Sequence, residues 1–388
     1  MSTKLQSLQQ WAKIVAVNLV IFLFLLIVAE ILARSVWTVR SCIKSECDFS
    51  RITGLKVRQI DRAINVGFSR FDPVLGLAPR EGFSSIINAP GWVENAKLTI
   101  TQDGFRSNGS GTIPGSSDVL VVGDSFTFGF QVSDSETWPA CLERKLGRGV
   151  DNGGVFDYGT AQALRRASLK LAEKSYTTLV LSTLVDPRNG DFERDRLRYR
   201  DGFPKPAVIH TTNGIELSAV PDPNAPGTKF NPSSVSLAYE QSEMVAATID
   251  RFFPLYNYSG ERLTVVHPNA ANENEIVDWD LRQFSRFPIK NKLLLLQYGS
   301  LDTTNVADVA EERKLVLRTA SELSLKVIDP ITVLRNYKES DLWFMDHGGH
   351  HTPLGNEVIC SYLFEQGFSK QASTFRPQTP QVKASALD

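Results

Sequence analysis

From residue 118 onwards, short apolar runs alternate with stretches in which apolar residues recur at helical spacing. An apolar run that is rich in β-branched residues and bounded by turn residues is typical of a strand buried on both faces of a parallel sheet. The strands predicted in this way are residues 119–122, 154–158, 178–185, 263–266 and 325–328. Residues 293–296 are also apolar, but their pattern leaves helix and strand open.

Helical periodicity follows most of these strands. Helices are predicted for residues 136–146, 161–174, 236–253, 309–323 and 356–365. Such alternation predicts an α/β fold in three layers, in which helices cover both faces of a mainly parallel sheet of about five strands, with right-handed crossovers. Ahead of this region, residues 97–101 alternate in polarity between two turn signals. They predict an edge hairpin packed before the main sheet.

The amino-terminal part of the chain has a different pattern. Residues 14–33 are apolar except for Asn18 and Glu30, and twenty helical residues span roughly 30 Å, the thickness of a bilayer core. A cleaved signal peptide is the alternative, but its apolar region is usually about 7–15 residues long and ends at a small-residue cleavage site. A retained transmembrane anchor, with Lys13 and Arg34 at its borders, is the favoured interpretation.

These patterns divide the chain into segments. The predicted segments are a cytoplasmic tail (1–13), the anchor (14–33), a neck (34–67), a globular domain (68–368) with an inserted hairpin (196–235), and a flexible tail (369–388). Basic residues flank both ends of the anchor, so charge does not settle its orientation. A bridge between Cys42 and Cys47 would form in an oxidising compartment, and it favours a periplasmic or other extracytoplasmic globular domain.

Composition narrows the classes of partner. The chain has 42 basic and 43 acidic residues, so nothing indicates a surface for nucleic acid. Four cysteines are too few for a scaffold held together by disulfides. Cys141 and Cys360 lie in apolar helical contexts and are predicted to be buried thiols. No cofactor is predicted.

The candidate chemistry begins at Gly123-Asp-Ser125, which follows the strand at 119–122 without a loop. In open α/β sheets, functional groups gather where strands end and helices begin, and a serine there exposes its hydroxyl beside backbone N–H groups. The same three residues also fit a turn that caps a helix. A serine nucleophile needs a base within hydrogen-bond reach, and three of the five histidines fall in one loop, at 346–351.

The two ends of this region together resemble the SGNH/GDSL hydrolase superfamily. Gly123-Asp-Ser-Phe-Thr-Phe-Gly129 resembles the first block of the family, and the loop at 346–351 resembles the last. Residues 103–107, 128–132 and 136–139 are similar to segments of membrane-anchored members. The resemblance covers roughly residues 68–368 and implies a flavodoxin-like α/β/α fold.

The resemblance also implies roles for single residues. Ser125 corresponds to the nucleophile, and its own backbone N–H corresponds to the first oxyanion donor. Gly159 matches the glycine of the second block, whose N–H is the second donor. His350 corresponds to the general base, because it lies five residues before Gly355, as in the H-x-x-P-x-G ending of the family.

Two further roles fall on residues that are displaced from the spacing of the family. Asn189 is the predicted third oxyanion donor, and an Asn-Gly turn is the alternative reading. Asp346, four residues before His350, is the predicted acid that orients the base. His351 is the second candidate for the base, and His347 is predicted to be a bystander.

A metal site is the competing interpretation of the same loop, since Asp346, His347, His350 and His351 are all ligand types. Three ligands within five residues of a Gly-Gly loop rarely fit one tetrahedron, and the serine motif would stay unexplained. No metal is predicted. His267, at the end of a predicted strand, is expected to be hydrogen-bonded.

The predicted function is therefore a membrane-anchored serine esterase that acts through Ser125, His350 and Asp346. Anchored relatives suggest that its substrate is an O-acyl group, acetyl in the first place, on a carbohydrate of the cell envelope, removed by hydrolysis or transferred. The alternative is a catalytically weak or inactive domain of the same fold that serves as a membrane-tethered binding or assembly component. The displacement of Asn189 and Asp346 from the spacing of the family motivates that alternative.

Overall fold

The structure of the chain is a computed structural model. It describes residues 2–44, 68–88, 91–109, 117–200, 203–221, 265–301, 307–344 and 349–369. The predicted helix at 236–253, the tail from 370, and Cys47 with its predicted bridge to Cys42 lie outside the described residues. The chain forms two compact units, and the second comprises residues 66–198, 205–221 and 266–388.

The first unit contains the long helix α1 (Ser2–Lys44). Its apolar part, Lys13–Val36, spans 24 residues and is long and apolar enough to cross a membrane. A signal sequence near an amino terminus can also be long and apolar enough to meet this description. Glu30 and Arg34, one helical turn apart, form an ion pair of 2.8 Å, which lowers the cost of placing two charges near the end of an apolar segment.

A five-stranded parallel sheet forms the centre of the second unit. Its strands are β5 (Val119–Val122), β6 (Val150–Asn152), β7 (Thr178–Leu184), β13 (Asn291–Gln297) and β14 (Lys326–Ile328). Their order is β14-β13-β7-β5-β6, and every neighbouring pair is parallel. In chain order this is the 2-1-3-4-5 arrangement of flavodoxin-like folds. The predicted α/β fold with a parallel sheet is confirmed, and all four residues of β5 are fully buried.

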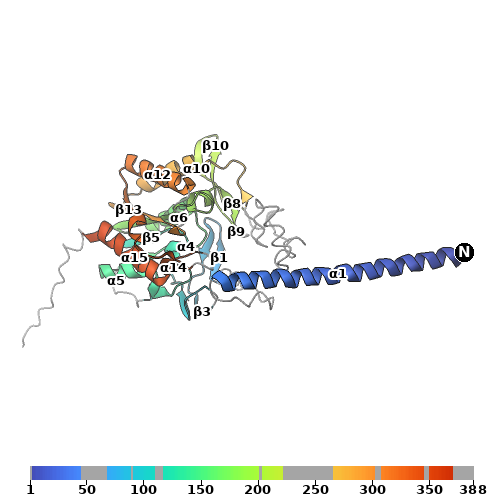
Figure 1. Ribbon diagram of the computed structural model, residues 1–388. Coiled ribbons are helices and arrows are strands. Elements are labelled where there is room, and N and C mark those ends of the chain that lie inside the picture. The colour runs from blue at the N-terminus through green and yellow to red at the C-terminus, as the bar shows by residue number, and fades with distance from the viewer. Residues whose placement is uncertain are drawn as a thin grey trace, which may run out of the picture. The chain divides into compact units, whose positions relative to one another are not determined.

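Helices cover both faces of this sheet. Figure 1 shows α6 (Thr160–Glu173), α10 (Glu273–Ser285) and α12 (Ala307–Glu322) on one side, with α5 (Trp138–Leu146) and α15 (Pro353–Leu363) on the other. Several of these helices begin at a capping side chain. Thr137 accepts a hydrogen bond from Ala140 N–H, Thr352 accepts one from Gly355 N–H, and Asn272 forms a capping box with Glu275. These caps satisfy N–H groups that have no partner within the helix.

The remaining described elements are short. The strands among them are β1 (Ser69–Asp72), β2 (Gly76–Pro79), β3 (Ser84–Ile87), β4 (Ala96–Thr99), β8 (Leu197–Arg200), β9 (Phe203–Pro204), β10 (Val208–Thr211), β11 (Gly214–Leu217) and β12 (Val265–Val266). The short helical segments are α4 (Ser125–Phe128), η1 (Asp134–Glu136), α7 (Asp191–Arg194), α13 (Ile331–Leu334), α14 (Glu339–Leu342) and η2 (Phe364–Phe368). The predicted strand at 97–101 corresponds to β4, which forms an antiparallel hairpin with β3.

Two strand predictions for the main sheet were wrong. The second strand is β6 at 150–152 and not 154–158, because Val150–Asn152 is the segment that pairs with β5. The fourth strand is β13, the apolar segment whose state the sequence left open, because it pairs along its whole length with β7. Residues 265–266 form the short strand β12 outside this sheet.

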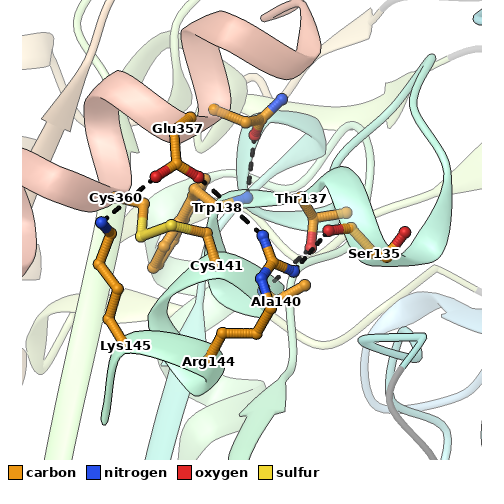
Figure 2. Close-up of a disulfide and its surroundings, with 10 residues drawn as sticks. Ser135, Thr137, Trp138, Ala140, Cys141, Arg144, Lys145, Glu357 and Cys360 are labelled. Atoms are coloured by element: carbon orange, nitrogen blue, oxygen red, sulfur yellow. Dashed lines mark hydrogen bonds and ion pairs between the residues drawn. A yellow bond between two sulfur atoms is a disulfide. The ribbon is translucent and has the colours of Figure 1, made fainter.

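The predicted thiols of Cys141 and Cys360 are instead a disulfide, with Cα atoms 6.1 Å apart. It joins α5 to α15, two helices that pack against each other, as Figure 2 shows. Beside it, Trp138 N–H donates to Asn356 Oδ1 (3.0 Å), and Glu357 forms an ion pair with Lys145 (3.3 Å). The helix that follows the Gly-Asp-Ser segment is therefore covalently fixed to the helix that follows the histidine loop.

Candidate active site

Ser125 lies at the carboxyl end of β5, at the first position of α4. The strand continues directly into this helix because Gly123 has no side chain: a Cβ there would collide with Thr127 Oγ1 and the carbonyl oxygen of Ser182. Asp124 is the N-cap, and its Oδ1 accepts the Phe126 N–H at 2.9 Å. Chain order reverses at β5, which lies between β6 and β7, and such switch points are where α/β folds bind ligands.

His350, near the carboxyl end of the domain's sequence, contacts this serine. Its Nε2 lies 2.8 Å from Ser125 Oγ, although the two residues are 225 positions apart. The loop that carries His350 runs directly into α15, which Thr352 caps and Pro353 begins. His351, the second candidate for the base, points elsewhere: its Nε2 lies 3.0 Å from Gln297 Oε1, and the residue is 2% exposed.

The other ring nitrogen of His350 contacts Gln131, which no expectation from the sequence had included. Nδ1 lies 2.9 Å from Gln131 Oε1, and Gln131 Nε2 donates to the carbonyl oxygen of Gly91 at 2.7 Å. This second bond fixes the amide so that its oxygen faces the imidazole. His350 therefore carries its proton on Nδ1, and Nε2 is free to accept the serine proton. Asp346 and His347 lie outside the described residues.

The surroundings of His350 favour the neutral imidazole. The rings of Phe126 and Phe130 each lie 5.0 Å from the imidazole, centroid to centroid. The pKa of His350 is lowered to about 4. Burial is the largest cause and the nearby positive charge of Arg194 is the second, while Asp157 acts in the opposite direction. At neutral pH the ring is therefore available as a base.

Gly159 lies after β6, as the N-cap of α6. A Cβ at this position would collide with the Asp195 carboxylate, so only glycine fits here. Asp195 Oδ2 accepts the Ala161 N–H at 2.9 Å and so satisfies part of the helix start. Within the described part of the chain, the N–H groups of Ser125 and Gly159 donate no hydrogen bond. Both are thus available to an oxygen atom of a ligand.

Asn189 lies in the turn between β7 and α7, where its own N–H donates to the carbonyl oxygen of Asp186 at 3.1 Å. Its side chain is exposed. The structure thus brings Ser125 and His350 together directly, whereas Asn189 lies in the exposed turn that was its alternative reading.

His267 also has a hydrogen-bond partner. His267 Nδ1 accepts the Asn269 N–H at 3.1 Å, and burial lowers the pKa of His267. Among the residues that the structure describes, no group of three or more His, Cys, Asp or Glu side chains has the geometry to hold a metal ion.

Comparison with known proteins gives structural matches only. No protein-family model matches the chain, and no curated protein matches it. A lipase/acylhydrolase from Enterococcus faecalis covers 68% of this chain and 100% of its own at 12% identity and a TM-score of 0.39. A member of the lipolytic protein G-D-S-L family from Veillonella parvula covers 64% and 97% at 12% identity and a TM-score of 0.34. An acetyl xylan esterase from Geobacillus stearothermophilus covers 65% and 94% at 9% identity and a TM-score of 0.36.

Proposed function

We propose that this chain is a serine ester hydrolase of the SGNH/GDSL type, with Ser125 as nucleophile and His350 as general base. One observation carries the proposal: Ser125 Oγ and His350 Nε2 lie 2.8 Å apart at the carboxyl edge of the sheet. A hydroxyl that donates to a neutral imidazole is the arrangement that activates serine for acyl transfer.

In the proposed reaction, Ser125 Oγ attacks the acyl carbonyl while His350 Nε2 takes the serine proton. The carbonyl oxygen becomes an oxyanion, which the N–H groups of Ser125 and Gly159 stabilise. His350 then gives the proton to the leaving alcohol, and an acyl-serine remains. Water, or a hydroxyl of a second sugar, attacks the acyl-serine by the same route in reverse and releases Ser125.

The group that orients His350 can be tested by mutation. Gln131→Leu removes the acceptor of the Nδ1 proton, and we expect kcat to fall on the order of 10²-fold because the imidazole loses its fixed tautomer. Gln131→Glu keeps an acceptor and adds a negative charge, which raises the pKa of His350 and moves the acid limb of the pH profile upwards. Steady-state kinetics with an acetyl ester measure both effects.

Asp346→Asn is the matched comparison, because Asp346 was the predicted orienting acid. If Asp346→Asn reduces kcat strongly and Gln131→Leu does not, Asp346 is the orienting group in the working enzyme, as the family resemblance implies. The reverse result assigns the role to Gln131.

The pH dependence of kcat/KM follows from the lowered pKa of His350. Only the neutral ring accepts the serine proton, so activity is lost as the pH falls through the pKa of the free enzyme, about 4. We expect kcat/KM to be nearly constant between pH 6 and 5, measured as released acetate. An acid limb near the ordinary histidine value of about 6.5 would contradict this environment for His350.

The proposed substrate is an O-acyl group, in the first place acetyl, on a carbohydrate of the cell envelope. The apolar part of α1 supports attachment to a membrane by length and composition, and the Cys141–Cys360 disulfide supports an oxidising compartment outside the cytoplasm. Acetate release from a panel of acetylated glycans tests this proposal. A wild-type protein that binds such glycans but releases no acetate would favour the alternative, a tethered binding component.

Topology needs its own test. We propose that residues 14–33 anchor the chain and that the domain at 68–368 lies outside the cytoplasm. A reporter that is active only in the periplasm, fused after Asp388, should be active. A reporter active only in the cytoplasm that gave the signal instead would overturn the placement.

A further inference from the structure

Arg194 is a buried cation behind the proposed site, and no motif in the sequence marks it. It ends α7, and its side chain is only 5% exposed. Its Nη1 donates to Asp191 Oδ1 (2.9 Å), Asp124 Oδ2 (3.0 Å) and the carbonyl oxygen of Tyr158 (3.3 Å). Acceptors from three separate segments thus meet at one nitrogen.

Two of these acceptors adjoin the peptide groups of the proposed oxyanion donors. Asp124 directly precedes Ser125, and its second carboxylate oxygen accepts the Phe126 N–H, so both of its oxygens are held. The Tyr158 carbonyl belongs to the same peptide unit as the Gly159 N–H. A cation at the carbonyl end polarises that peptide and makes its N–H a stronger donor.

The charges around Arg194 are arranged asymmetrically. Two carboxylates, Asp124 and Asp191, are 0% and 1% exposed beside the single guanidinium. Burial and the neighbouring Asp124 charge raise the pKa of Asp191. The charge of the same guanidinium lowers the pKa of His350 and so disfavours its imidazolium. The guanidinium therefore contacts both the turn that carries Ser125 and the Tyr158–Gly159 peptide, and its charge also acts on His350.

We propose that Arg194 is the positioning residue of the oxyanion hole: it holds the Asp124–Ser125 turn and the Tyr158–Gly159 peptide so that both N–H groups converge on the tetrahedral intermediate. The inference rests on the proposed ester hydrolysis at Ser125. It accounts for the oxyanion hole through two backbone donors, without a donor from Asn189, whose side chain is exposed. Arg194 acts through these two peptides and not by contact with the substrate.

The test compares full-length wild type with Arg194→Met, Arg194→Lys and Asn189→Ala. Rates are expressed per active site titrated with a fluorophosphonate, so that unfolded protein is not counted. We expect Arg194→Met to lower kcat for an acetyl ester on the order of 10²-fold and to change KM by less than about threefold, because the oxyanion exists only after attack. Arg194→Lys keeps the charge and should retain more activity. Asn189→Ala should stay within about threefold of wild type in kcat.

Two further readouts separate positioning from simple stabilisation. Affinity for a trifluoromethyl ketone, which forms a tetrahedral adduct with serine, should fall by about the same factor as kcat in Arg194→Met. The acid limb of kcat/KM should move to higher pH, because a cation near His350 has been removed.

Arg166→Met is the matched control. Arg166 is another buried arginine, 3% exposed, that donates to the carbonyl oxygens of Gly153 (2.9 Å) and Gly104 (2.6 Å). It should leave both readouts unchanged per titrated site.

The double variant Asp191→Asn/Arg194→Met addresses the case in which Arg194→Met does not fold. It removes one anion with the cation and so restores the balance of buried charge. If the double variant regains wild-type kcat, Arg194 serves only to balance charge, and the positioning proposal is overturned. If kcat stays about 10²-fold low in the folded double variant, the proposal is supported.

Failure of this inference is distinct from failure of the proposed function. If wild type neither hydrolyses acetyl esters nor reacts with the fluorophosphonate, both fall together. If wild type is active and Arg194→Met matches the Arg166→Met control in kcat, only the role of Arg194 is wrong. A large loss in Asn189→Ala beside an unchanged Arg194→Met would identify Asn189 as an oxyanion donor and overturn the role of Arg194.

Discussion

Replacing Ser125 by alanine is expected to lower kcat/KM for p-nitrophenyl acetate on the order of 10⁴-fold or more. The reason is that Ser125 Oγ is the atom that forms the acyl bond in the proposed reaction, and His350 Nε2 then has no hydroxyl to deprotonate. The backbone should not change, because alanine keeps the N–H of residue 125 and Asp124 still caps α4. Ester hydrolysis by purified full-length protein in detergent measures the effect.

Ser135→Ala is the matched control, since Ser135 lies in the same part of the chain and is exposed. It should retain wild-type activity. If Ser125→Ala hydrolysed the ester as fast as wild type, the measured activity would not arise at Ser125 and the assignment of the nucleophile would be wrong.

Removing the Cys141–Cys360 disulfide is the change with the largest expected effect on stability. The two cysteines are 219 positions apart, and a bridge that closes a long loop restricts the unfolded chain, typically by about 2–5 kcal/mol in free energy of unfolding. It also ties α5 to α15, the helices that follow the segments of Ser125 and His350. The variant Cys141→Ala/Cys360→Ala should therefore unfold at a clearly lower denaturant concentration and lose activity at a lower temperature than oxidised wild type.

Reductant provides the control for this prediction. Reduced wild type should unfold close to the double variant, and the double variant should respond little to reductant. Equal unfolding midpoints for oxidised wild type and the double variant would show that the bridge does not stabilise the domain.

The fold was predictable where the pattern of the chain is repeated and strong. Residues 119–122 and 178–185 are apolar and rich in β-branched residues, which predicts central strands. The alternation with helices predicts their parallel arrangement. The prediction failed at residues 154–158 because Val155 and Tyr158 are apolar and fully buried without being in a strand. It stayed open at 293–296 because leucine fits helix and strand alike, and pairing with β7 decides between them.

The site shows the same division between local and long-range information. Ser125 and His350 stand in recognisable motifs, so each was found from its own neighbours in the sequence. Gln131 lies 219 positions from His350 and Arg194 lies 70 from Asp124, and their roles exist only because the fold brings these side chains together. The sequence marked Gln131 only by its apolar neighbours and by the similarity of residues 128–132 to a segment of membrane-anchored members. For Arg194 and for the pairing of Cys141 with Cys360, no local signal exists.

The central claim is that Ser125 is a nucleophile activated by His350. The most direct test of this assignment is covalent labelling of the full-length protein by a fluorophosphonate. The adduct is detected by intact mass and then located by peptide mapping. The proposal predicts one adduct per chain, located on Ser125, absent in Ser125→Ala and strongly slowed in His350→Ala. An unlabelled wild-type protein, or an adduct on another residue, would contradict it.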